Sequence, residues 1–465
     1  MIDVFSRRFQ SFAIEFTADS LVCFVSALLA AWQFAPSSLM PGRDFLASGA
    51  VVWAGAFAIL MSMMYSFVGL YRRGTILFSA RTHVQRTFLA VLTGSAIAFV
   101  ALAISGHRSG GTALFGVGIL YVSAGALAVR GVSYVARKSR VGLKRILIVG
   151  TGEEAQAVAL DIRNSTRSAA LVVGFFPAGT QEDAAGNPQN FSPENSLEQV
   201  VQEHRIDEIV VAMREQRGGA VPMSQLLACR IRGINVLDLA GFYERAHGEV
   251  PTDSLKASWL VYGRGFVQSP LRAFIKRAVD ISFSLVLLVL AAPLMVLAAT
   301  AIRLESPGSI IYTQERVGRG GTLFKCRKFR SMRTDAEKDG VARWATKNDS
   351  RVTRVGSLIR KTRIDELPQL FSVLRGNMSL VGPRPERPSF VATLKETIPY
   401  YDIRHSVKPG VTGWAQVRFG YCATIDDSRR KHQFDLYYVK NNSLALDLLV
   451  MIETVSVVLF REGSQ

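Results

Sequence analysis

Residues 281–302, ISFSLVLLVLAAPLMVLAATAI, decide the class of this chain. The run carries no charge and is as long as the roughly 20 residues that a helix needs to cross a bilayer core. Basic residues flank it on both sides, Lys276 and Arg277 before it and Arg303 after it. If the run crossed a membrane, one basic flank would face the outside, which the positive-inside rule disfavours. Pro293 removes a helix hydrogen bond in mid-run and can bend the helix sharply. The sequence therefore predicts a re-entrant helix that bends at Pro293 and keeps both flanks cytoplasmic, with a Pro-kinked spanning helix as the alternative.

The first part of the chain carries further apolar runs of nearly spanning length. There are four of them, at roughly residues 12–34, 45–70, 87–105 and 112–132. Glu15 and Asp19 lie inside the first run, which argues against a cleaved signal peptide. Basic residues concentrate before the first run, between the second and third, and after the fourth. We therefore expect residues 1–138 to form four transmembrane helices with both ends in the cytoplasm.

Residues 144–250 show the pattern of a parallel α/β domain. Strand-like runs end at Val149, Phe176, Met213 and Leu239 and alternate with helical segments. Gly150-Thr151-Gly152 after the first run resembles a dinucleotide-binding turn. Against nucleotide binding, no acidic residue follows the second strand, and Glu153 and Glu154 occupy the turn where a pyrophosphate would bind. We predict a Rossmann-like domain with a structural, regulatory or oligomerisation role, followed by a linker over residues 251–275.

The charge of the chain fits a membrane surface. The 465 residues carry a net charge of +18, which suits either nucleic acid or anionic lipid. The apolar runs favour the membrane, so we expect membrane lipids and no nucleic acid as partners. The four cysteines lie far apart without a CxxC pair, which predicts neither a disulfide framework nor a zinc site and indicates a reducing compartment.

Residues 358–386, LIRKTRIDELPQLFSVLRGNMSLVGPRPE, place acidic and basic side chains together. Asp365 and Glu366 are neighbours, and the cations near them in sequence include Arg360, Arg363 and Arg384. Arginine binds phosphate oxygens bidentately, whereas carboxylates ligate hard cations or attack phosphorus. The stretch predicts a site for a phosphate and a divalent cation, and a solvated, charged helix end is the alternative.

Other segments of the C-terminal part are polar. Lys328 and Arg330 belong to a cation-rich strand, residues 324–332, which can border an anionic substrate or contact lipid headgroups. Residues 318–321 lack the P-loop pattern and predict a basic turn. The apolar run 443–460 contains two acidic residues, so an interfacial or core helix is favoured over a spanning one.

Several blocks after Lys276 resemble one known family. They are KRAVDISFSLVLLVLAAP, SPGSIIYTQERVGRGGTLFKCRKFRSM, the stretch 358–386 with the residues just before it, KPGVTGWAQV and FDLYYVKNNSLALDLLVMIETV. Their order is similar to that of the polyprenyl-phosphate hexose-1-phosphate transferases, the large members of the monotopic phosphoglycosyl transferase superfamily. The resemblance implies a small, mainly α catalytic domain over residues 276–465, with the re-entrant helix 281–302, at the cytoplasmic face of the bacterial inner membrane.

The resemblance also implies an activity and roles for residues. Hexose-1-phosphate would pass from a UDP-hexose, with glucose or galactose as the sugar, to undecaprenyl phosphate, releasing UMP and initiating an exopolysaccharide or O-antigen-type glycan. Asp365 would be the covalent nucleophile and Glu366 a ligand of Mg²⁺. Arg360 and Arg384 would hold phosphate, and Pro293 would break the re-entrant helix. The chain departs from the family pattern at Arg363, Ile364 and Asn377.

Two other functions are alternatives to this one. A membrane-anchored nucleotide-sensing or scaffold protein would use the α/β domain as its active part. An NAD-dependent sugar-nucleotide epimerase would need a Tyr-x-x-x-Lys motif, which the α/β region does not contain. The α/β domain is also the surface through which we expect a homodimer, while no motif specifies the hexose.

Overall fold

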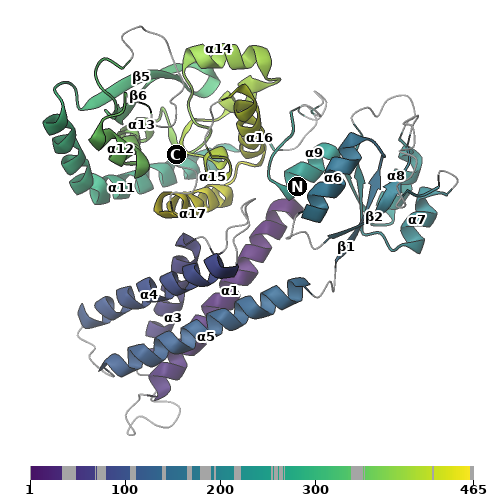
Figure 1. Ribbon diagram of the computed structural model, residues 1–465, viewed down its shortest axis with the longest axis horizontal. Helices are drawn as coiled ribbons and strands as arrows, with labels where there is room; N and C mark the ends of the chain where they lie inside the picture. Colours follow the sequence, from purple (N-terminus) through teal and green to yellow (C-terminus); the bar gives the residue numbers. More distant parts are fainter. Residues whose placement is uncertain are drawn as a thin grey trace. The chain divides into compact units, whose positions relative to one another are not determined.

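The computed structural model divides into two compact units, one formed by Met1–Val129 and Tyr262–Gln465 and the other by Arg130–Val261 (Figure 1). It describes residues 2–33, 49–68, 70, 80–104, 111–138, 143–164, 170–178, 190–192, 195–213, 221–252, 255, 260, 265–266, 268–336, 349, 351–420 and 424–460. The predicted linker 251–275 is therefore described only in part, and its last residues already belong to a helix. Cys422 lies outside the described residues, and the other three cysteines are buried and form no disulfide within the described part of the chain.

Four helices occupy the apolar runs of the first part: α1 (Ile2–Gln33), α3 (Ala50–Phe67), α4 (Ala80–Ile104) and α5 (Gly111–Lys138). Buried side chains from all four form one cluster, with Met61 and Tyr65 of α3 fully buried. Among the described residues of these helices, the segment Phe16–Gln33 of α1 is by length and composition apolar enough to cross a membrane, and the apolar parts of α3, α4 and α5 are shorter. The four helices are confirmed, and four membrane crossings stay a prediction.

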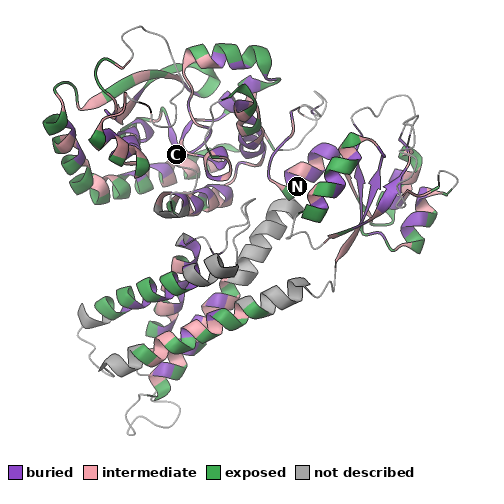
Figure 2. Cartoon of the chain, viewed as in Figure 1, coloured by how far each residue is buried: buried purple, intermediate pink, exposed green. Residues whose placement is uncertain are grey.

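The unit Arg130–Val261 contains a four-stranded sheet in the order β2-β1-β3-β4, with every neighbouring pair parallel. Its strands are β1 (Lys144–Val149), β2 (Ala170–Phe176), β3 (Glu208–Val211) and β4 (Asn235–Asp238). Helices α6 (Glu153–Asn164) and α9 (Leu239–Ala246) pack on one face, and α7 (Leu197–Glu203) and α8 (Met223–Ile231) pack on the other. Strands β1, β2 and β3 are largely buried between these layers, whereas the edge strand β4 is only partly buried (Figure 2). The predicted parallel α/β sheet is therefore confirmed.

The glycine turn after β1 has a packing explanation. Gly150 has φ 117, and a Cβ atom there would lie 3.0 Å from Cγ of Met213 and 3.1 Å from the carbonyl oxygen of Ala212. Glycine is required by this backbone conformation and close approach, whether or not a nucleotide binds.

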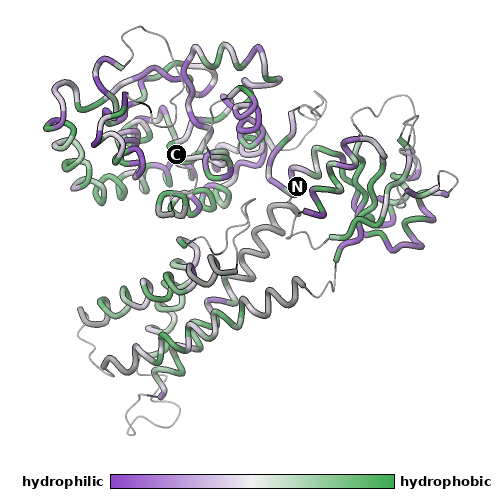
Figure 3. Tube along the Cα trace, viewed as in Figure 1, coloured by the Kyte–Doolittle hydropathy of each residue, from purple (hydrophilic) through white to green (hydrophobic). Residues whose placement is uncertain are grey.

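The apolar run 281–302 lies in α11 (Pro270–Glu305), a single helix with Pro293 in its interior. Figure 1 shows its ribbon changing direction along its length. It is also apolar and long enough to cross a membrane, and its side chains are largely exposed, Val289 at 73% and Leu290 at 70% (Figure 3). An apolar surface without protein partners fits a lipid environment. The helix is confirmed, and its return to the same face of a membrane stays a prediction.

The C-terminal part is mainly α, as predicted, with two small sheets. The hairpin β5 (Ile311–Val317) and β6 (Leu323–Phe329) encloses the predicted basic turn, and β7 (Ser379–Val381) pairs in parallel with β8 (Gly410–Thr412). The helices are α12 (Arg354–Lys361), η3 (Ile364–Gln369), α13 (Leu370–Arg375), α14 (Pro388–Thr397), η4 (Tyr401–Ser406), α15 (Trp414–Arg418), α16 (Ile425–Asn441) and α17 (Leu444–Phe460).

Polar contacts fix the first turns of α11 to this part. Nζ of Lys276 donates to Oδ2 of Asp447 in α17 at 2.7 Å. Arg277 donates to the carbonyl oxygens of Val373 and Leu374 at 2.6 and 2.7 Å, which satisfies the C-terminus of α13. The two cations predicted as a membrane flank thus bind protein groups, and they hold α11 to the elements that carry the acidic pair.

Candidate active site

The acidic pair lies on η3, a short helix between α12 and α13. Arg363 follows the end of α12 in the left-handed conformation, with φ 58, and turns the chain into η3. Ile364 then packs against a cluster that includes Ile302 of α11 and Phe329 of β6. This anchoring leaves Asp365 and Glu366 buried, at 8% and 6% exposure. A solvated helix end, the alternative for this stretch, is therefore wrong.

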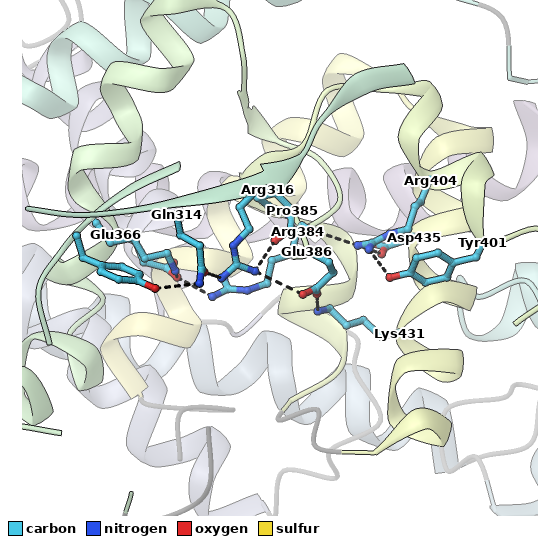
Figure 4. Close-up of polar contacts among 12 residues, drawn as sticks. Gln314, Arg316, Glu366, Arg384, Pro385, Glu386, Tyr401, Arg404, Lys431 and Asp435 are labelled. Carbon is cyan, nitrogen blue, oxygen red and sulfur yellow. Dashed lines mark hydrogen bonds and ion pairs between the residues drawn. The ribbon is translucent and has the colours of Figure 1, made fainter. Parts of the chain in front are cut away.

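Three cations from three segments converge on Glu366. Its Oε1 accepts hydrogen bonds from Nη2 of Arg384 at 2.9 Å (Figure 4) and from Nζ of Lys328 at 2.8 Å. Nη1 of Arg363 lies 3.9 Å from the same oxygen. Burial acts to raise the pKa of Glu366, but Arg384, Lys328 and Arg363 together outweigh it and hold the pKa well below its usual range. Glu366 is therefore an anion at every physiological pH.

Asp365 lies beside this cluster without a bonded cation. Within the described part of the chain, no hydrogen bond reaches its carboxylate. Burial, and then the charge of Glu366, raise the pKa of Asp365 to about 6, while Lys328, Arg363 and Arg384 oppose the shift. At neutral pH the group is mostly ionised and its lone pairs are unoccupied. These are the properties of a carboxylate that can attack an electrophile.

A polar row on β5 borders the site. Nε2 of Gln314 donates to the hydroxyl of Tyr312 at 2.9 Å, and Oε1 of Gln314 accepts from Nη2 of Arg316 at 2.7 Å. Nη1 of Arg316 donates to the carbonyl oxygen of Pro385 at 3.1 Å. The row joins the hairpin to the segment that carries Arg384, as Figure 4 shows.

A buried ion pair fixes Arg384 from behind. Nη2 of Arg404 donates to the carbonyl oxygen of Arg384 and to Oδ2 of Asp435, both at 2.8 Å. Nη1 of Arg404 donates to the hydroxyl of Tyr401 at 2.7 Å (Figure 4). Both members of the pair are buried, Arg404 at 3% and Asp435 at 1%. Because Asp435 lies on α16, this helix becomes the support for the backbone of Arg384.

Glu386 forms a second acidic centre two residues after Arg384. It pairs with Lys431 of α16 at 3.0 Å and with Arg316 at 3.7 Å. Burial alone would raise its pKa, but Lys431, Arg404 and Arg316 together lower it to about 2. The sequence analysis missed Arg404, Asp435 and the role of Glu386, and the only local signal was the position of Glu386 at the end of the quoted stretch.

The remaining predicted residues lie elsewhere. Arg330 donates to the carbonyl oxygens of Ser306 and Pro307, both at 2.7 Å, just after the C-terminus of α11. These contacts occupy its guanidinium, so a contact with substrate stays a prediction. Arg360 is half-buried in the last turn of α12 and forms no ion pair among the described residues. Asn377 is exposed in the turn after α13.

The acidic pair fits a hard divalent cation that also binds substrate. In the described part of the chain, no three His, Cys, Asp or Glu side chains could hold a metal by themselves. Magnesium, however, commonly takes one or two carboxylates together with substrate phosphates and water. The carboxylate of Asp365 and Oε2 of Glu366 have no protein donor among the described residues, so both can act as ligands.

Comparison with known proteins places these features in one family. Residues 271–461 match the model of the family described as bacterial sugar transferase. An N-acetylgalactosaminephosphotransferase of Aeromonas hydrophila, named for UDP-N-acetylgalactosamine and undecaprenyl phosphate, is 43% identical over 261 residues, 56% of this chain and 61% of the relative. The undecaprenyl-phosphate glucose phosphotransferase of Komagataeibacter xylinus is 35% identical over 333 residues, 69% of this chain and 60% of the relative.

A third relative is covered more fully. The UDP-glucose:undecaprenyl-phosphate glucose-1-phosphate transferase of Escherichia coli strain K12 is 33% identical over 329 residues, 67% of either chain. For the other two relatives, the chain spans about three fifths of their length.

Proposed function

The chain belongs to the bacterial sugar transferase family, and from this premise we propose that it transfers hexose-1-phosphate from a UDP-hexose to undecaprenyl phosphate. The reaction releases UMP and initiates an exopolysaccharide or O-antigen-type glycan at the inner membrane. One observation carries the proposal: the unbonded carboxylate of Asp365 lies next to Glu366, on which Lys328 and Arg384 converge. The names of the three relatives support undecaprenyl phosphate as the acceptor.

The first step uses Asp365 as the nucleophile. One of its oxygens attacks the phosphorus of the sugar-bearing phosphate, and the bond from that phosphorus to the bridging oxygen breaks. UMP leaves with the electron pair, and the sugar phosphate stays bonded to Asp365. A carboxylate attacks an anionic phosphate only where cations offset the repulsion, and Lys328 and Arg384 supply that charge. Mg²⁺, held by Glu366, would add further positive charge on the phosphate oxygens.

The second step returns Asp365 to its starting state. An oxygen of undecaprenyl phosphate attacks the same phosphorus, the bond to Asp365 breaks, and the lipid carries a diphosphate-linked sugar. Dividing the transfer in two lets a soluble donor and a lipid acceptor use one site in turn. The exposed apolar surface of α11 supports a position of this site at the level of the lipid phosphates, and a re-entrant course bent at Pro293 would keep it on the cytoplasmic side.

The covalent step gives the sharpest test. Asp365→Asn should abolish UMP release and the labelling of the protein by UDP-[¹⁴C]hexose in the absence of lipid acceptor. Asp426→Asn is the matched control, since it makes the same chemical change at a carboxylate that is 89% exposed in its side chain. Full activity of Asp365→Asn, or equal labelling of both variants, would refute the proposal. The donor panel should contain UDP-glucose, UDP-galactose and UDP-N-acetylgalactosamine, because the relatives are named for two different sugars.

A homodimer through the α/β unit belongs to the same proposal. Met223, Leu227 and Ile231 recur at helical spacing along α8 and are exposed, Ile231 at 78%. An apolar stripe of this kind is a surface that a second copy can cover. Light scattering of the full chain in detergent should give a dimer, and Leu227→Glu should give a monomer. Leu160→Glu, at an exposed leucine of α6, is the control.

A further inference from the structure

Arg363 differs from the other two cations at Glu366 in its contacts. Lys328 and Arg384 both donate hydrogen bonds to Oε1, at 2.8 and 2.9 Å, whereas Nη1 of Arg363 is 3.9 Å away, beyond hydrogen-bond distance. Its side chain is 39% exposed, compared with 21% for Lys328 and 28% for Arg384. No side-chain hydrogen bond of Arg363 exists within the described residues. A guanidinium thus lies at the acidic pair with its five donors unused.

The backbone at Arg363 is unfavourable for arginine. It follows the last residue of α12 and its cap Thr362 with φ 58, a position that helices usually fill with glycine. A side chain in this conformation is strained, and such strain persists where the side chain has a function. Strain alone does not show a function, because Arg205 after α7 has φ 47 and an exposed side chain. The position of the Arg363 guanidinium beside Glu366 is the second observation.

The site holds more cations than acids. Three cations, Lys328, Arg363 and Arg384, lie within 3.9 Å of Glu366, which has one acidic neighbour, Asp365. Lys328 and Arg384 already satisfy Glu366 by hydrogen bonds. Arg363 is the farthest of the three cations from Glu366 and the most exposed, so it is the one that can turn to a ligand.

We propose that Arg363 is a substrate-binding residue, whose guanidinium turns from Glu366 to the diphosphate of the bound sugar nucleotide. The proposal rests on the proposed function for the identity of the ligand as a nucleoside diphosphate sugar. A planar guanidinium suits this ligand, since it can donate two parallel hydrogen bonds to one phosphate. The ordinary energy of a charge-assisted hydrogen bond gives an expected loss of about 10- to 100-fold in affinity when it is removed.

Arg363→Gly separates substrate binding from a structural role, because the melting temperature and the Kd for UDP should change differently. Glycine relieves the backbone, so the melting temperature of the full chain in detergent should stay equal or rise. The Kd for UDP, measured by calorimetry, should rise by about 10- to 100-fold. Arg363→Lys, which keeps the charge but loses the planar fork, should have an intermediate Kd. The control Arg205→Gly makes the same change at a left-handed arginine of the α/β unit and should leave the Kd unchanged.

Two results would overturn the proposal. One is a Kd for UDP in Arg363→Gly within about twofold of the parent chain. The other is a lower melting temperature together with the weaker binding, since that pattern means that Arg363 supports the fold. Failure of the proposed function would give a different result. The parent chain would then release no UMP from any UDP-sugar, although it would still bind UDP with a Kd that depends on Arg363.

Discussion

Two kinds of buried charge occur in the C-terminal part, and their pairing differs. Behind the site, three buried acids each pair with one cation at 2.7 or 2.8 Å, as Arg404–Asp435, Lys276–Asp447 and Arg418–Glu453. In the site, Lys328 and Arg384 both bind Glu366, and no cation among the described residues bonds to Asp365 next to it. Burial is common to both kinds. The site differs in that two cations share one carboxylate beside a second carboxylate, and we propose that this arrangement keeps Asp365 reactive and leaves positive charge for a phosphate.

The largest effect should come from removing the cation of a matched pair. Arg404→Met leaves Asp435 buried without its partner and removes the hydrogen bond to the carbonyl oxygen of Arg384. We expect a loss of about 3–5 kcal/mol in stability, measured as a lower melting temperature in detergent. The double variant Arg404→Met/Asp435→Leu should recover part of the loss, since both charges are then absent.

A matched control separates stability from catalysis. Arg418→Met breaks the pair with Glu453 of α17 at 2.7 Å and leaves the hydrogen bond from Arg404 to the carbonyl oxygen of Arg384 in place. It should lower the melting temperature similarly, whereas only Arg404→Met should also raise KM for the UDP-sugar, through a misplaced Arg384. Equal KM values for the UDP-sugar in Arg404→Met and Arg418→Met would contradict the role of α16 in holding the backbone of Arg384.

In the site, the next largest effect should come from Glu366. Glu366→Gln removes the charge on which Lys328 and Arg384 converge, and their positions relax. We expect UMP release to fall by at least about 100-fold, in the range seen when one preorganised electrostatic group is lost. The charge of Glu366 also raises the pKa of Asp365, so the acid limb of the residual activity should move to lower pH. A variant with normal activity would show that unequal pairing is not needed.

The sequence predicted the elements whose signals are local. The apolar run in α11, the four parallel strands and the strand of Lys328 each follow from the pattern of neighbouring residues. The structure also brings Lys328 and Arg384 to Glu366, although 38 and 18 residues separate them from it. The resemblance implied a phosphate-holding role for Arg384, and the cation-rich strand predicted only that Lys328 could border an anionic substrate, because no spacing rule joins such distant positions to Glu366.

The remaining features depend on tertiary contacts that have no local signal. Arg330 is two residues from Lys328, but the end of β6 turns it to the carbonyl oxygens after α11. Arg404 and Asp435 are 31 residues apart, and each is an ordinary polar residue of its own segment. The left-handed conformation of Arg363 was unpredictable for a similar reason, since propensity favours glycine there.

A smaller effect should appear in the pH dependence of stability. The pKa of Asp365 is about 6 in the folded chain, above its ordinary value of 3.8, so the folded state holds this proton more tightly. The stability from protonation is fully present below pH 3.8 and is lost as the pH rises through about 6. At pH 7.5, Asp365→Asn should therefore stabilise the chain by on the order of 2 kcal/mol.

That gain should disappear near pH 4, where Asp365 itself is protonated. Melting temperatures of both chains from pH 4 to pH 8 would measure it, with Asp426→Asn as an exposed control. If the melting temperatures of the parent chain and Asp365→Asn differed by the same amount at every pH in this range, the raised pKa of Asp365 would be contradicted. The ionised carboxylate would then not lower the stability of the fold.

The smallest effect tests whether distance or burial determines how much stability an ion pair contributes. Lys395 and Asp402 are 2.7 Å apart, as close as Lys276 and Asp447, but their side chains are 44% and 62% exposed instead of 15% and 6%. Water screens an exposed pair and holds its ions almost as well as the partner does, so Lys395→Ala should change stability by about 0.5 kcal/mol or less. Lys276→Ala leaves Asp447 buried without its cation and should cost about 3 kcal/mol or more. Thermal melts of the two variants, repeated at high salt, compare them directly. If both lost the same stability, the short distance alone would be decisive, and burial could not be what separates the structural pairs from ordinary surface charges.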